Sequence, residues 1–159
     1  EKWRLIIAGY PELNYLNLLH KFIDDNNLRF SVDICRPFEG EELENIYKNS
    51  KIFILPTFSE NFGIVVAEAM SYGLPTITTK GAPWELLNDE EAGWCCETNI
   101  RDIKKTLVKI SKLTDDEYQL MSKNALRVAR EFEWRKVTDS YIKLYEWVLG
   151  ISKKPDFVL

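Results

Sequence analysis

The sequence lacks the basic surface that nucleic-acid binding requires. Its 25 acidic residues outnumber its 21 lysines and arginines, which gives a formal net charge of -4 at pH 7, and no basic run interrupts the mixture. Proteins bind nucleic acids by displacing condensed counterions with lysine and arginine side chains. We therefore expect no nucleic-acid partner.

Cysteine and histidine are also scarce. The cysteines are Cys35, Cys95 and Cys96, and His20 is the one histidine. An odd cysteine count without framework spacing argues against a disulfide-stapled secreted domain, and adjacent cysteines pair poorly because the bridge is strained. We expect three reduced thiols in or near the core, where free cysteines usually lie. A lone histidine without neighbouring ligands predicts no metal site.

Long apolar runs are missing too. No segment reaches the roughly 18 consecutive apolar residues of a membrane-spanning helix, and no signal peptide opens the sequence. The chain starts at Glu1 without a methionine and runs directly into an apolar segment, so we expect it to be a domain cut from a longer protein. Of the 159 residues, 45% are apolar and 13% are aromatic, which is enough for one sizeable core.

Short apolar segments alternate along the chain with segments of helical periodicity. The predicted strands are residues 3–8, 30–35, 51–55, 76–79 and 93–96. The predicted helices are residues 11–26, 41–48, 63–72, 99–112, 115–131 and 134–148, with a turn at residues 81–87 leading into one more short helix.

This alternation predicts a Rossmann-like α/β domain with three layers, α/β/α. Its parallel sheet is expected to be covered by helices on both faces, because the predicted strands are almost entirely apolar. We expect one domain over residues 1–150 and a frayed tail at residues 151–159. Ligands of such sheets bind at the carboxyl ends of the strands, so the loops there carry the function.

The loop after the third predicted strand is the most unusual of them. It leads from Pro56 to Gly63, where an apolar helix is predicted to begin. Gly63 has no Cβ, so a ligand can approach the backbone closely. The amide groups of Gly63, Ile64 and Val65 lack intrahelical acceptors and carry the positive end of the helix dipole, which favours a phosphate.

Two acidic residues flank this predicted helix start. Glu68 stands among apolar neighbours in a helix that we expect to be buried on most sides, where a carboxylate needs a partner. The hydroxyls of a ribose beside the bound phosphate would satisfy Glu68, and Glu60 in the loop is placed to bind sugar hydroxyls. Two plainer interpretations stay open: Glu68 pairs with a distant basic residue, or Gly63 is an ordinary turn glycine.

Taken together, these residues resemble a known signature. Glu60 and Glu68, with seven residues between them and the sequence AMSYGLP following at residues 69–75, look like the E-x7-E motif of the group 1 retaining glycosyltransferases, family 4, which have the GT-B fold. The similarity extends over about residues 3–149. It is limited to the second, carboxyl-terminal domain of that fold, which binds the nucleotide sugar.

The resemblance implies a role for each acidic residue. Glu60 would be the catalytic residue, contacting the hydroxyls of the donor sugar on the face where the leaving bond breaks. Glu68 would bind the hydroxyls of the ribose. Glu85 lies in the stretch KGAPWE at residues 80–85, which is similar to a Gly-x-x-x-Glu stretch of the family, and would support the loop by capping or bonding local amides.

The resemblance also implies which groups hold the rest of the donor. Arg36, in the loop after the second strand, would flank the nucleobase. Lys80, at the end of the fourth strand, would be the cation best placed to reach the diphosphate. The remaining donor-binding residues would act through the backbone around the helix start, and they are Asn61, Phe62, Gly63, Ile64 and Val65.

The family transfers sugars without a bound metal, and this sequence has no Asp-x-Asp motif. We therefore expect no metal and no cofactor beside the nucleoside-diphosphate sugar, so amides and cations must stabilise the leaving diphosphate. The usual basic pair of the family, in a Gly-Arg-Leu and a Lys-Gly stretch before the first strand, is absent from this sequence. Two lost charge-assisted hydrogen bonds of ~1.5–3 kcal/mol each would weaken nucleotide binding by roughly 10²–10⁴-fold.

The function expected from the resemblance is a retaining hexosyl transfer. The donor would be linked to UDP or GDP, and the acceptor would be a glycan or a lipid-linked glycan in cell-surface polysaccharide or lipopolysaccharide biosynthesis. The acceptor would be reached through an amino-terminal domain that this chain does not include, so the chain alone is expected to be inactive. We expect a cytoplasmic location, at the inner face of the membrane, with peripheral association through that missing half.

Other functions remain to be weighed. One alternative is a nucleotide-binding or structural module derived from this family that transfers nothing; the presence of both Glu60 and Glu68 argues against it. A dinucleotide-dependent oxidoreductase would need Gly-x-Gly-x-x-Gly after the first strand, where the sequence reads GYPELN at residues 9–14. An inactive subunit of a glycan-synthesis complex differs only in its biochemistry.

Overall fold

The computed structural model describes residues 3–158. The chain divides into two compact units, residues 1–46 and residues 47–159. Helices and strands alternate in the order that the sequence predicts. The expected single domain over residues 1–150 stays a prediction.

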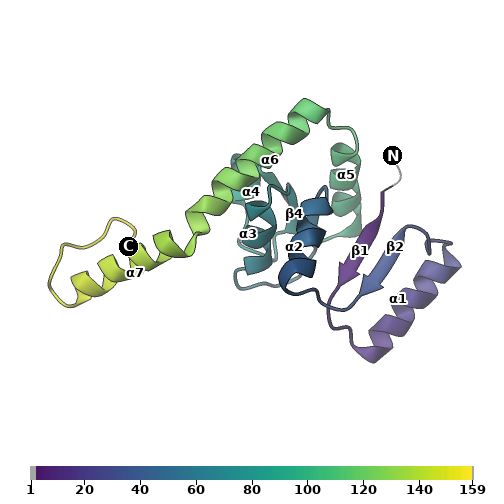
Figure 1. The fold of residues 1–159 in the computed structure, drawn as a ribbon, viewed down its shortest axis with the longest axis horizontal. Coiled ribbons are helices and arrows are strands. Elements are labelled where there is room, and N and C mark those ends of the chain that lie inside the picture. The colour runs from purple at the N-terminus through teal and green to yellow at the C-terminus, as the bar shows by residue number, and fades with distance from the viewer. Residues whose placement is uncertain (1–2, 159) are drawn as a thin grey trace. The chain divides into compact units, whose positions relative to one another are not determined.

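The first unit is built on two parallel strands. Strand β1 (Leu5–Ala8) pairs with β2 (Val32–Cys35), with Leu5 opposite Val32 and Ala8 opposite Cys35. Helix α1 (Leu13–Asp25) connects the two strands (Figure 1). Ile23 is its buried residue. Helix α2 (Gly40–Asn49) begins in this unit and ends in the second.

The second unit is built on three parallel strands in the order β3–β4–β5. Their bounds are Phe53–Leu55, Thr76–Thr79 and Gly93–Cys96. The central strand β4 is buried along its whole length, as the middle strand of a covered parallel sheet should be. A Cβ on Gly93 would lie 2.0 Å from the carbonyl oxygen of Thr76, so β5 can approach β4 this closely only with glycine at that position.

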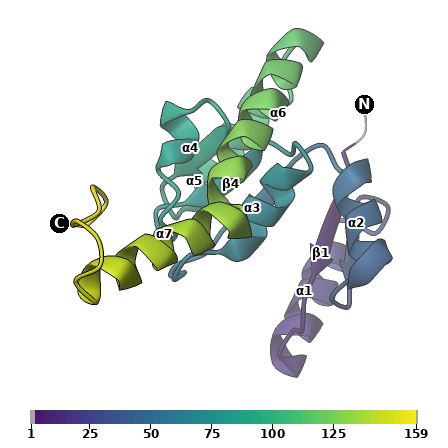
Figure 2. The ribbon, with the colours of Figure 1, turned by 60° about the vertical axis from the view of Figure 1, so that its left-hand side comes forward.

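Six helices follow β3 in the described part of this unit. They are α3 (Ile64–Ser71), α4 (Leu86–Asp89), α5 (Ile100–Ile110), α6 (Asp115–Ala129), the 3₁₀ helix η1 (Arg130–Phe132) and α7 (Trp134–Val148). Helix α3 packs against α6 (Figures 1 and 2). The buried residues of the unit's hydrophobic core include Val66, Met70, Trp84, Leu87 and Val128.

Two helices begin at side-chain caps that the sequence encodes. The Asn99 side chain accepts a hydrogen bond from the Asp102 amide at the start of α5. At the start of α6, Thr114 and Glu117 form a capping box, in which each side chain bonds the backbone amide of the other residue. Helix α7 differs from both, since its first turn has no side-chain cap and none of its residues is buried.

The structure confirms the expected α/β fold with parallel strands, and the strands at residues 76–79 and 93–96 have the predicted bounds. It corrects two details. The strands form two sheets, one in each unit, where one sheet was expected. Strand β1 is also not covered on both sides, because Leu5 and Ile6 are 44% and 39% exposed beside a two-stranded sheet with one connecting helix.

The expectations about the three cysteines and about membrane-spanning helices can also be compared with the structure. Cys35, Cys95 and Cys96 are free; Cys95 is buried and the other two are half-buried, as predicted. Within residues 3–158, no helix has the length and apolar character needed to cross a membrane.

Candidate functional site

The loop after β3 is tied to the loop after β4 by three hydrogen bonds. Each joins a residue that follows one strand to a residue that ends or follows the other, and the donor–acceptor pairs are Thr79–Thr57, Glu60–Gly81 and Trp84–Phe62. In each pair the acceptor is a backbone carbonyl oxygen. Because both loops leave the carboxyl ends of adjacent parallel strands, they meet at the edge of the sheet where ligands of α/β proteins bind.

The close contact of the two loops requires glycine at position 81. A Cβ on Gly81 would lie 2.5 Å from the carbonyl oxygen of Thr57 and 2.5 Å from the carbonyl carbon of Phe58. Backbone atoms cannot yield to such a contact as a flexible side chain can. The Gly81 carbonyl accepts the Glu60 amide at 2.7 Å, so this glycine also fixes the backbone of the predicted catalytic residue.

Trp84 also anchors the loop after β3. Its side chain is fully buried, and its indole N–H donates to the carbonyl oxygen of Phe62. The ring centroid of Trp84 lies 5.1 Å from that of Phe62 and 4.9 Å from that of Phe132. These contacts hold the backbone immediately before α3 in one place.

Gly63 takes the conformation that only glycine adopts easily. It precedes α3 with φ 74° and ψ 59°, in the left-handed region. A Cβ there would lie 3.1 Å from Cγ of Glu60 and 3.3 Å from Cδ2 of Leu55. Gly63 therefore allows both the turn into the helix and the placement of the Glu60 side chain against it.

The start of α3 presents unsatisfied backbone donors. Among the described residues, the amides of Gly63, Ile64 and Val65 have no hydrogen-bond acceptor. The first amide of the helix that has an acceptor is that of Val66, which donates to the Gly63 carbonyl. Ile64 is 52% exposed, so this helix end is open. These donors and the helix dipole form an environment suited to an anion.

Glu60 is half-buried in the loop just before these amides. Its Oε1 accepts a hydrogen bond from the amide of Asn61 at 2.9 Å. Of the predicted donor-binding amides, that of Asn61 is therefore already occupied by a carboxylate. The carboxylate of Glu60 itself keeps further acceptor positions, since a carboxylate can accept about four hydrogen bonds.

Glu68 is exposed, so the expectation that it is buried was wrong. Helix α3 buries Val66, Ala69 and Met70, which form only one side of it. Ile64 lies four residues before Glu68 on the same face of the helix, and that face is open although Ile64 is apolar. The apolar composition of α3 concealed its exposed side. Glu68 therefore lies about 6 Å along the axis from the free amides, at 1.5 Å per residue.

Glu68 has a neighbour that the sequence did not suggest. The Tyr47 ring is buried, and the charge of Glu68 acts on its hydroxyl. Burial, followed by the nearby charge of Glu68, raises the pKa of Tyr47 to about 12. The alternative in which Glu68 pairs with a distant basic residue stays a prediction.

The two basic residues predicted for the donor each contact a carboxylate of the chain. Lys80, which follows β4, forms an exposed ion pair with Glu97, and the hydrogen bond to Glu97 raises the pKa of Lys80. Arg36, in the first unit, pairs with Glu42 at 2.8 Å and also donates to the carbonyl oxygen of Pro37. Their roles in donor binding stay predictions.

Glu85 does not cap the helix that follows it. It stands at the N-cap of α4, but its side chain makes no capping hydrogen bond, and it is exposed. Its backbone is already helical there, with φ -59° and ψ -29°, and a side-chain cap needs an extended N-cap residue. The support of the loop comes instead from Trp84 and Gly81.

The described residues contain no group of three or more histidine, cysteine, aspartate or glutamate side chains that could hold a metal ion. The expectation of metal-independent chemistry stays a prediction.

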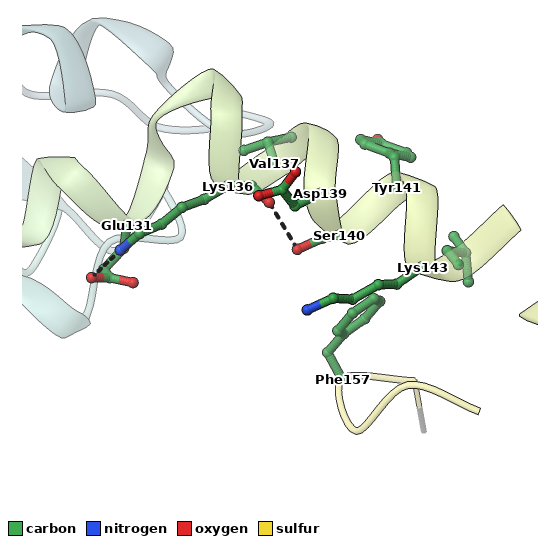
Figure 3. Close-up of a pocket in the computed structure, with 9 residues that line it drawn as sticks. Glu131, Lys136, Val137, Asp139, Ser140, Tyr141, Lys143 and Phe157 are labelled. Carbon is green, nitrogen blue, oxygen red and sulfur yellow. Dashed lines mark hydrogen bonds and ion pairs between the residues drawn. The ribbon is translucent and has the colours of Figure 1, made fainter. Parts of the chain in front are cut away.

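A separate shallow hollow of about 620 Å³ lies along α7. Figure 3 shows Phe157 of the tail next to the Lys143 side chain, with Tyr141 on the same helix. None of the predicted site residues lines it. The functional argument therefore stays with the loops after β3 and β4.

Comparison with known proteins identifies the family of this chain. The protein family described as "Glycosyl transferases group 1" matches residues 1–128. The GDP-mannose:cellobiosyl-diphosphopolyprenol alpha-mannosyltransferase of Xanthomonas oryzae is 28% identical over 161 residues, which is 99% of this chain and 42% of that enzyme. The D-inositol 3-phosphate glycosyltransferase of Saccharomonospora viridis is 29% identical over 89% of this chain and 34% of that enzyme.

Solved structures have the same fold. A glycosyltransferase from Rickettsia africae superposes with a TM-score of 0.82 at 19% identity, over 94% of this chain and 41% of that one. HepE from Anabaena, in complex with UDP, superposes with a TM-score of 0.74 at 19% identity, over 93% of this chain and 41% of that one. The chain thus spans less than half the length of these relatives. Since the family matches most of the sequence, this chain belongs to the group 1 glycosyl transferases.

Proposed function

We propose that this chain binds a nucleoside-diphosphate sugar at the start of α3 for retaining transfer of a hexosyl group. The observation that carries the proposal is the set of free amides at Gly63, Ile64 and Val65, with Glu60 before them and Glu68 one turn after them. The diphosphate would accept hydrogen bonds from these amides. Glu68 would receive the ribose hydroxyls and Glu60 those of the sugar.

The arrangement suits a leaving diphosphate. Negative charge grows on the diphosphate as its bond to the sugar breaks, and fixed backbone donors stabilise such charge without having to reorganise. The donors here are fixed, because Gly81 and Trp84 hold the loop that precedes them. In this proposal no metal takes part, and Glu60 contacts the sugar on the face where its bond to the diphosphate breaks.

Binding by the chain alone is expected to be weak. Lys80 and Arg36 contact Glu97 and Glu42, so each would have to exchange a carboxylate for the donor phosphate or base. Surface ion pairs contribute only ~0–1 kcal/mol, which makes that exchange feasible without making it strongly favourable. The backbone amides would then provide most of the diphosphate affinity.

The donor and acceptor are proposed by class. UDP is the nucleotide bound in the Anabaena structure, and GDP-mannose is the donor in the name of the Xanthomonas enzyme, so UDP- and GDP-sugars are the donors to test first. That enzyme's name also contains a diphosphopolyprenol acceptor, which supports a glycan or lipid-linked acceptor bound by a further domain. We place the reaction in the cytoplasm, at the inner face of the membrane, in the biosynthesis of surface polysaccharide or lipopolysaccharide.

The binding site can be tested by NMR titration of the chain with UDP and with GDP. We expect the amide signals of residues 62–66 to shift with one or both nucleotides. Uridine and guanosine, which lack phosphates, serve as controls and should leave the amides of Gly63, Ile64 and Val65 in place. Nucleotide-induced shifts confined to other residues would refute the site.

The roles of the two acids can be separated in the enzyme that joins this chain to an acceptor domain. We expect Glu68→Ala to raise KM for the donor, because it removes a binding contact. Glu60→Ala should mainly lower kcat, on the order of 100-fold, the size of effect seen when one group acting on the transition state is lost. If Glu60→Ala kept near-normal turnover, the assignment of that residue would be wrong.

A further inference from the structure

The side chain of Glu60 lies beside the free amides of α3. Its Oε1 accepts the Asn61 amide at 2.9 Å. Its Cγ lies 3.1 Å from the point where a Cβ on Gly63 would stand. Since a carbon–carbon bond is about 1.5 Å long, this Cγ is within about 5 Å of the Gly63 Cα. The backbone of Glu60 is fixed as well, because its amide donates to the Gly81 carbonyl at 2.7 Å.

This arrangement puts a negative charge of the protein next to the place where the diphosphate is proposed to bind. The start of α3 attracts anions through its free amides and its dipole. The carboxylate of Glu60 acts in the opposite sense on a phosphate there, and the repulsion is stronger at a half-buried group than in open water. The nearest cation proposed for the diphosphate does not cancel this charge, because Lys80 pairs with Glu97 at 2.5 Å.

Donor and product differ at the phosphate beside Glu60. In a nucleotide sugar the terminal phosphate is esterified and carries one negative charge. When the sugar is transferred, the electron pair of the broken bond stays on that phosphate, and the acceptor hydroxyl that forms the new bond gives up its proton. The freed phosphate ionises further with a pKa near 6, so the product carries about one more negative charge than the donor above neutral pH.

We propose that Glu60 makes the site discriminate between these two ligands, because its carboxylate binds hydroxyls of the intact donor sugar and repels the extra charge of the free nucleoside diphosphate. Glu60 thereby favours the exchange of product for new donor. This inference rests on the proposed function. It concerns the ligands before and after transfer, so it is separate from the action of Glu60 on the breaking bond. A carboxylate that only capped the Asn61 amide would treat both ligands alike.

The test measures how neutralising Glu60 changes the affinity for each ligand. The variant is Glu60→Gln, which removes the charge but keeps the size of the side chain and an oxygen that can accept the Asn61 amide. The ligands are UDP and UDP-glucose, or GDP and GDP-mannose if the guanosine nucleotide binds more tightly. Dissociation constants come from NMR titration at pH 8, and thermal unfolding reports whether each variant is folded.

The matched control is Asp116→Asn, which removes one carboxylate charge elsewhere in the same unit. Asp116 is exposed in the first turn of α6. The other end of α6 leads into Phe132, whose ring centroid lies 5.5 Å from that of Phe62 beside the site. Thirteen residues of helix separate Asp116 from that end, which is about 20 Å and beyond the range of an unscreened charge at physiological salt.

We expect Glu60→Gln to bind UDP about fivefold more tightly than the wild-type chain, because a repulsion of that order is removed. The variant should bind UDP-glucose about twofold more weakly, since a neutral amide accepts sugar hydroxyls less strongly than a carboxylate does. The ratio of the two dissociation constants therefore changes about tenfold, as the product of these two effects. Asp116→Asn should keep the wild-type ratio within about twofold.

The possible failures are distinguishable. If Glu60→Gln binds both ligands as the wild-type chain does, or gains the same factor for both, the inference is overturned and the proposed function stands. If neither ligand shifts the amides of residues 62–66 in the wild-type chain, the proposed function itself fails.

A third ligand separates charge from contacts with the sugar. The methyl ester of UDP at its terminal phosphate has the charge of the donor but no sugar. We expect Glu60→Gln to raise the preference for UDP over this ester about threefold relative to the wild-type chain. Glu60→Ala, which also lacks the charge, takes its place in this comparison if thermal unfolding shows that Glu60→Gln is not folded. An unchanged preference would mean that Glu60 does not sense the terminal charge, and the inference would fail.

Discussion

Helix α3 and helix α7 belong to the same unit but use apolar residues in opposite ways. Three of the eight residues of α3 are buried, and Val66 and Met70 are completely enclosed by the core. None of the fifteen residues of α7 is buried, although it carries large apolar side chains such as Trp134, at 77% exposed, and Val148, at 68%. Figure 2 shows α7 continuing the chain after α6.

The difference shows where the unit stores its stability and where it places its chemistry. The candidate site lies at the start of α3 and on its exposed face, while Val66 and Met70 of the same helix are packed in the core. The positions of Glu60 and the free amides depend on that packing through Trp84. Helix α7, in contrast, has no buried residue. Substitutions in the two regions should therefore differ in their effect on stability.

The largest effect is expected from Trp84→Ala. Its side chain is fully buried, contacts two aromatic rings and bonds to the carbonyl of Phe62, so truncation leaves a cavity and an unpaired carbonyl. We expect a loss of about 3–5 kcal/mol in the free energy of unfolding, measured by urea denaturation. Trp84→Phe keeps most of the ring volume and should lose less. A loss below about 1 kcal/mol would contradict the packing described here.

A smaller effect is expected from Tyr47 at alkaline pH. The folded protein holds the Tyr47 proton more tightly than an unfolded chain, in which tyrosine has a pKa near 10, because burial and Glu68 raise the folded pKa to about 12. This contribution to stability is therefore complete below pH 10 and is lost as the pH rises toward 12.

The measurement is the free energy of unfolding of the wild-type chain and of Tyr47→Phe from neutral pH to pH 11. The wild-type curve should fall toward the variant's curve as the pH passes 10. Two curves that stay parallel over that range would show that Tyr47 titrates like an unperturbed phenol. The comparison cancels the titration of lysines and of the other tyrosines, which both proteins share.

The sequence predicts most of the fold because the signals for it are local. Apolar runs ended by glycine or proline mark the strands, and the two strands at residues 76–79 and 93–96 are found with unchanged bounds. The E-x7-E spacing identified the loop and helix that contain the free amides.

What the sequence could not show depends on contacts between distant residues. The exposure of Glu68 is hidden because its neighbour Ile64 is apolar and yet faces outward. Tyr47 and Glu68, whose charge acts on the Tyr47 hydroxyl, are twenty-one positions apart and lie on different helices, as the numbering shows. The fit of Gly81 against Thr57 is set by the pairing of β3 with β4, which no single segment encodes.

The smallest effect is expected from Trp134→Ala, the counterpart of Trp84→Ala on the exposed helix. Trp134 is the first residue of α7 and is 77% exposed, so truncation removes little buried area. Alanine is also the better helix former, which offsets part of any lost contact. We expect the free energy of unfolding to change by less than about 0.5 kcal/mol, as for most surface substitutions. A loss of more than about 2 kcal/mol in the same urea experiment would mean that Trp134 is packed in solution, and the contrast between α3 and α7 would then not hold.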